Sequence, residues 1–69
     1  MKISTLTSEG MHDEEKATVD EAIEYIKKQI KERSLWLFLD GKPVAESDIN
    51  PGEIAHASEI IMMSELTGG

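Results

Sequence analysis

The sequence predicts a small α+β domain in which one amphipathic helix packs on a mixed β-sheet. Three observations predict it: a helical stripe of apolar residues in the first half, short apolar runs of strand character on both sides of it, and an Asp-Gly turn between two of those runs. A chain of 69 residues has the length of one domain. We therefore expect residues 1–69 to form a single unit without repeats or linkers.

The helix is predicted by apolar residues that recur three and four positions apart. Thr18 is followed three residues later by Glu21, which is the pattern of a capping box and places the helix start there. A longer helix that begins at Asp13 is the alternative. The apolar stripe consists of Val19, Ala22, Ile23, Ile26 and Ile30.

A β-hairpin is predicted directly after the helix. Residues 34–39 form an apolar run with two aromatic side chains, and the run ends at Asp40 and Gly41. Asp-Gly is a strong signal for a two-residue turn between antiparallel strands. Residues 42–44 would supply the second strand of the hairpin.

Two further strands are predicted near the ends of the chain. Residues 2–6 and 59–64 have strand composition. Residues 10–16 are a weaker candidate for a strand, because they are strongly acidic. Residues 45–58 contain many turn-forming residues, so we expect mostly irregular structure with one helical turn.

Both faces of the predicted sheet carry apolar side chains. Leu35, Leu37 and Leu39 would face the helix, since alternate residues of a strand lie on opposite faces. The other face would then hold a docking patch for a partner, unless residues 45–58 fold over it and bury Trp36 in the core. This patch comprises Trp36, Phe38, Ile61 and Met63.

The charge balance limits the possible partners. Fourteen acidic residues against seven basic ones give a formal net charge of −7. Such a chain repels phosphate backbones and anionic membranes, so we expect no nucleic-acid or membrane partner and a preference for a basic protein surface. No apolar run approaches the roughly 20 residues of a membrane span, and no signal peptide is evident. We expect a cytoplasmic protein.

Catalytic and metal-binding chemistry is poorly supported. The chain has no cysteine, and its two histidines, His12 and His56, lie far apart in the sequence without converging ligands, so no metal site is expected. The serines lie in no nucleophile motif, so we expect no enzyme activity. The acidic run 13–15 indicates either a solvated surface or steering towards a basic partner.

Four segments resemble the small ubiquitin-like sulfur carriers of the ThiS and MoaD kind. The resemblance covers nearly the whole chain, and the terminal Gly-Gly is its chemical signature. It implies the β-grasp fold of that family. The segments are the first strand at 1–3, the helix start at 18–23, the hairpin at 37–44, and a last strand that leads to Gly68 and Gly69.

The resemblance also implies a function. An activating enzyme would use ATP to adenylate the carboxylate of Gly69, beside Gly68, and the product would become a thiocarboxylate that serves a sulfur-accepting enzyme. Thr67 and Leu66 would be recognised as part of the tail. Residues 66–69 have no side chain to pack beyond Leu66, so we expect them to form a mobile tail. The carrier binds no permanent cofactor, and we expect a monomer when it is free.

Two alternatives remain open at this point. The helix, the hairpin around Asp40 and the strand before Gly68 are also similar to the ubiquitin-like part of lambda-type phage tail-assembly proteins. The chain would then be an interaction domain, or a protein modifier joined to amines through Gly69. In a third interpretation it is a binding module in which Gly-Gly has no role.

Overall fold

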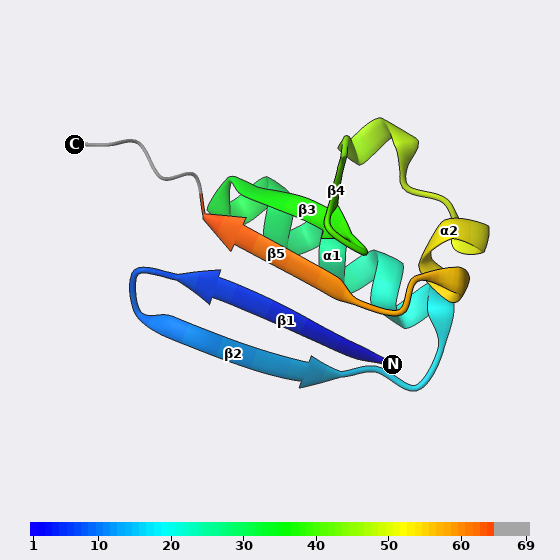
Figure 1. Cartoon of the computed structure of the whole chain (residues 1–69), viewed down its shortest axis with the longest axis horizontal. Helices are drawn as coiled ribbons and strands as arrows, with labels where there is room; N and C mark the ends of the chain where they lie inside the picture. The colour runs from blue at the N-terminus through cyan, green and yellow to red at the C-terminus, as the bar shows by residue number, and fades with distance from the viewer. Residues whose placement is uncertain (65–69) are drawn as a thin grey trace.

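Five strands form one mixed sheet, and the longest helix crosses one face of it (Figure 1). The computed structural model describes residues 1–64. The strand order is β2-β1-β5-β3-β4, with β1 and β5 parallel at the centre and every other neighbouring pair antiparallel. This is the β-grasp arrangement, which confirms the predicted α+β fold. The elements are β1 (Lys2–Thr7), β2 (Gly10–Glu15), α1 (Val19–Arg33), β3 (Leu35–Leu39), β4 (Lys42–Val44), the 3₁₀ turn η1 (Glu46–Asp48), α2 (Pro51–His56) and β5 (Ile60–Ser64).

Helix α1 begins where the capping pattern predicts. The Thr18 hydroxyl accepts a hydrogen bond from the backbone N–H of Glu21 at 3.1 Å, which satisfies one of the free donors of the first turn. The alternative start at Asp13 is wrong, because that residue belongs to β2. The helix ends at Ser34, whose φ of 53° lies in the left-handed region and turns the chain into β3.

The core lies between α1 and the sheet. Leu35, Leu37 and Leu39 are buried on the helix side, as their alternation predicts. Ile26 of α1 is fully buried as well. Within residues 1–64 the buried apolar residues are Ile3, Ala22, Ile26, Leu35, Leu37, Leu39, Ile49, Ile54, Ile60 and Met62.

The acidic segment after the first turn is a full strand, although its composition argues against one. Cross-strand partners on β1 compensate its charges: Asp13 accepts a hydrogen bond from the Ser4 hydroxyl at 2.8 Å and lies 3.6 Å from Lys2 Nζ. The amino group of Met1 lies 2.9 Å from a Glu15 carboxylate oxygen. Opposite charges on facing strands stabilise the pairing.

Residues 45–58 contain more helix than the sequence predicts. They form the turn η1 and the six-residue helix α2. The Asn50 side chain caps α2 by accepting from the backbone N–H of Glu53 at 2.9 Å, and Pro51 occupies its first turn. Ile54 is fully buried, and α2 packs against α1. This burial stabilises a helix that is too short to form alone.

The turn of the predicted hairpin also joins β3 to the start of β5. Asp40 and Gly41 have φ values of 51° and 84°, as a two-residue type I′ turn requires. The Asp40 carboxylate accepts hydrogen bonds from the backbone N–H groups of Ser58 and Glu59 at 2.9 and 2.8 Å. The hairpin is therefore fixed to the loop that leads into the central strand.

Candidate functional site

Four large apolar side chains lie in one line across the face of the sheet that is opposite to α1. Leu6 of β1 pairs with Met11 of β2 on one side and with Met63 of β5 on the other. Met63 pairs in turn with Trp36 of β3. We call Met11, Leu6, Met63 and Trp36 the apolar row.

The apolar row is open to solvent. Met11 is 62% exposed, Trp36 52% and Leu6 40%, while Met63 is half-buried between its neighbours. Figure 1 shows this face towards the viewer, with α1 behind the sheet. A contiguous apolar surface of this kind is typical of protein-docking sites.

The alternative in which residues 45–58 bury Trp36 is wrong. That segment places Ile49 and Ile54 in the core, and its helix α2 packs on α1. No element among residues 1–64 covers the apolar row. The ring of Trp36 is therefore available to a partner.

The predicted patch lies together on this face. Phe38 pairs with Ile61 in the register next to the apolar row, and both side chains are half-buried. They lie beside Trp36 and Met63 on the same face, and Trp36 is the most exposed of the four. Sequence reasoning missed Leu6, which lies in the predicted first strand on the same side as Lys2 and Ser4. It also missed Met11, which joins the surface only if residues 10–15 form a strand.

The apolar row crosses β5 close to its carboxyl end. Met63 is followed by Ser64, the last residue that the structure describes. The predicted carrier terminus, Gly68 and Gly69, and the predicted recognition residues, Thr67 and Leu66, lie outside the described residues. The sequence places them within the five positions after Ser64.

An apolar groove adjoins Trp36 at the other edge of the sheet. Its volume is about 340 Å³, and it lies between α1 and the β3–β4 hairpin. Ile30, Leu35 and Val44 line it together with Trp36. A partner that contacts the apolar row can insert an apolar side chain here.

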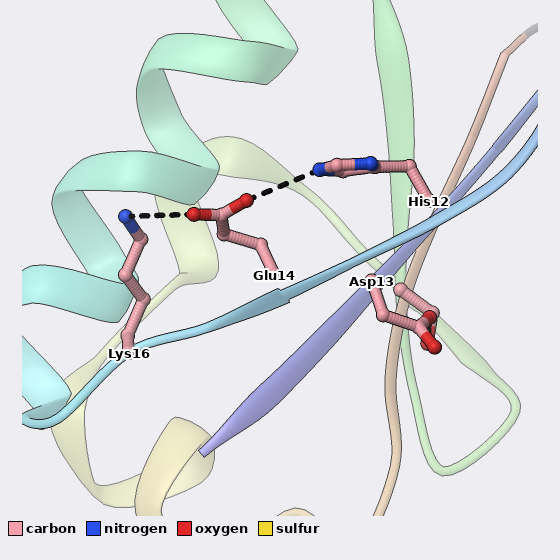
Figure 2. Close-up of polar contacts among 5 residues, drawn as sticks. His12, Asp13, Glu14 and Lys16 are labelled. Atoms are coloured by element: carbon pink, nitrogen blue, oxygen red, sulfur yellow. Dashed lines mark hydrogen bonds and ion pairs between the residues drawn. The ribbon is translucent and has the colours of Figure 1, made fainter.

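A cluster of charged side chains lies on the side of β2 that faces α1. Figure 2 shows Glu14 between His12 and Lys16, whose nitrogen atoms lie 3.1 and 3.7 Å from its carboxylate oxygens. The hydrogen bond from His12, and next the positive charge of Lys16, lower the pKa of Glu14 below its ordinary value of 4.5. Asp13 points to the opposite side of the strand. Lys16 Nζ also lies 4.7 Å from the ring centre of Tyr25, a cation–π distance.

Residues 1–64 contain no group of three His, Asp or Glu side chains that could hold a metal ion. No helix between Met1 and Ser64 is long and apolar enough to cross a membrane.

Comparison with known proteins gives no relative. No family model, no curated protein and no solved structure matches the chain. The fold and the chemistry of its surface are therefore the basis for a functional assignment.

Proposed function

We propose that the chain is a ubiquitin-like sulfur carrier that docks on an activating enzyme through the apolar row. The enzyme transfers AMP from ATP to the carboxylate of Gly69 and releases pyrophosphate, and sulfide from a sulfur donor then displaces AMP to give a thiocarboxylate. A sulfur-accepting enzyme consumes that product. The chain itself is a protein substrate and performs no catalysis.

The observation that carries this proposal is the position of the apolar row relative to the end of β5. Five residues follow Ser64 in the sequence, and fully extended they span at most about 17 Å. An enzyme that binds Trp36 and Met63 therefore has the Gly69 carboxylate within reach of the same interface. Docking and chemistry would occur on one continuous surface.

Two glycines at positions 68 and 69 suit entry into a narrow active site. Neither residue has a Cβ atom, so the backbone can approach enzyme groups closely and adopt positive φ values. A side chain at either position would obstruct such a channel. Entry into a narrow active site would therefore explain the presence of two successive glycines in the tail.

Trp36 is expected to contribute most of the docking energy. A half-exposed tryptophan beside an apolar groove has the properties of an interface hot spot, where truncation costs about 2 kcal/mol or more of binding free energy. Met63 and Leu6 would exclude water around it. Trp36→Ser should weaken binding to the activating enzyme and leave the fold intact. Tyr25→Ser, on the α1 side, is the matched control that should leave binding unchanged.

The first test is the mass of the C-terminal peptide of the protein isolated from its own cells. The proposal expects Gly69 to be the last residue and part of the population to carry sulfur in place of one carboxylate oxygen. An isopeptide bond from Gly69 to lysines would identify a protein modifier instead. Further residues beyond Gly69, or an unmodified carboxylate even with an adenylating enzyme and ATP, would contradict the carrier.

A further inference from the structure

The two edges of the sheet differ in their ability to accept another strand. The β4 edge is three residues long and contains Pro43, which has no N–H to donate. The β2 edge is six residues long, has no proline, and pairs only with β1 among the described strands. Figure 1 shows β2 as the outermost strand. Only the β2 edge has the length and the donors for strand addition.

The hydrogen-bond alternation identifies the groups that β2 offers. Lys16 and Met1 exchange two hydrogen bonds, from the Lys16 N–H at 2.9 Å and from the Met1 ammonium at 3.0 Å. Backbone groups of an antiparallel strand alternate between its two sides. The backbone N–H and C=O groups of Met11, Asp13 and Glu15 therefore point away from β1.

A groove of about 550 Å³ runs between this edge and α1. Its strand side includes Thr5 and His12, and its helix side includes Tyr25, Gln29 and Arg33. An added strand would place alternate side chains over this groove and the others on the face of the apolar row.

A buried hydroxyl in the groove lining lacks a partner. Thr5 is only 2% exposed, and its Oγ1 forms no hydrogen bond with the rest of the described chain. Within residues 1–64 it is the only buried side-chain polar atom without a hydrogen-bond partner. A buried polar group without a partner is costly, so this hydroxyl lowers the stability of the domain.

The charges along this edge are already balanced within the chain. Each of four carboxylates has a cation within 4 Å, so the edge attracts neither a basic nor an acidic segment strongly. The pairs are Glu9 with Arg33, Asp13 with Lys2, Glu14 with Lys16, and Glu15 with the amino group of Met1.

A second copy of this chain fits the edge poorly. Outward-facing residues must pair with outward-facing residues, so the antiparallel register that overlaps all of 11–15 places Asp13 of one copy opposite Asp13 of the other. Like charges directly opposite each other destabilise a strand pair. A different, uncharged strand avoids this repulsion.

We infer that the β2 edge binds an uncharged extended peptide of a partner protein by strand addition. Its backbone bonds to Met11, Asp13 and Glu15. The residue opposite Met11 is apolar and extends the apolar row by one position. The side chains over the groove are uncharged and polar. This inference does not rest on the carrier proposal, because the site uses neither Gly69 nor Trp36.

The test uses peptides selected from a displayed library that lacks Lys, Arg, Asp and Glu. We expect selected peptides to shift and protect from exchange the amides of Met11, Asp13 and Glu15 in NMR spectra. Asp13→Pro removes an outward donor without breaking a bond to β1, so it should weaken binding by at least roughly tenfold. Asp13→Ala loses the same carboxylate and keeps the N–H, so its affinity should stay near that of the wild type.

A second measurement modifies the peptide and uses the wild-type protein. N-methylation of the peptide amides that face β2 should abolish binding, whereas methylation of the alternate amides should not.

Four outcomes would overturn the inference. They are recovery of no binding peptide, mapping of the peptides to another surface, equal sensitivity to both sets of N-methyl groups, and a wild-type dimer that Asp13→Pro dissociates. The last would make a second copy the occupant.

Discussion

Replacing Thr5 by valine should make the protein more stable. Thr5 lies in β1 beside Met62 of β5, is 2% exposed and has a hydroxyl without a partner. Valine has the same branched shape and also favours strands, so the substitution removes a polar group and little else. Burying an unsatisfied hydroxyl costs about 1–3 kcal/mol, and that cost should be recovered in the free energy of unfolding.

For a domain of this length, 1 kcal/mol shifts Tm by roughly 4–8 °C. Thr5→Val should therefore raise Tm by about 4 °C or more in calorimetry, and raise the urea midpoint with an unchanged m value. Thr7→Val is the matched control on the same strand. The Thr7 hydroxyl accepts from the backbone N–H of Glu9 at 3.2 Å, so this substitution should lower stability slightly.

A lower unfolding free energy for Thr5→Val would refute the reasoning. It would show that the hydroxyl gains more from a hydrogen bond than it loses by burial. An unchanged stability would set the cost of the unpaired hydroxyl near zero, contrary to the 1–3 kcal/mol used here.

Substitutions at three further positions test individual contacts. Asp40→Ala removes a charged acceptor of two backbone N–H groups and should lower the unfolding free energy by about 2–3 kcal/mol in urea denaturation, whereas Asp40→Asn should retain most of it. Thr18→Ala should cost about 1 kcal/mol through loss of the α1 cap, and Thr18→Ser should cost much less; equal losses would contradict a capping role. His12→Ala should raise the pKa of Glu14 towards 4.5 in an NMR titration of its carboxyl group. Because the folded-state pKa of Glu14 is lowered, its contribution to stability is present above pH 4.5 and is lost as the pH falls through the folded value, so the variant should show a shallower acid dependence.

The parts of the fold that depend on neighbouring residues could be read from the sequence. The cap at Thr18, the helical stripe and the turn at Asp40 and Gly41 each involve residues within a few positions of one another. The buried side of β3 followed from simple alternation. These features need no knowledge of which strands pair.

The parts that depend on pairing could not be read in the same way. Strand β2 carries three consecutive acidic residues, and its partners Lys2, Ser4 and the amino group of Met1 become relevant only once β1 lies beside it. Helix α2 has a visible cap at Asn50, but six residues form a helix only when Ile54 is buried against the core.

The docking surface could likewise be predicted only in part, because some of its residues come together through strand pairing. Trp36 and Phe38 were predicted correctly to lie on the face away from the helix, because alternation within one strand decides it. Leu6 and Met11 became part of the surface through the registers of β1 with β5 and of β1 with β2. A single sequence does not specify those registers.

The position of β5 at the centre of the sheet has a consequence for synthesis of the protein. The β1–β2 and β3–β4 hairpins are made first, but no ladder joins them directly. Ile60 and Met62 are the last buried residues within positions 1–64 to be synthesised, and they belong to the strand that connects the two hairpins. A nascent chain that stops before Ile60 holds two hairpins with exposed apolar surfaces, each only marginally stable in water. The order of translation thus delays completion of the sheet until β5 emerges.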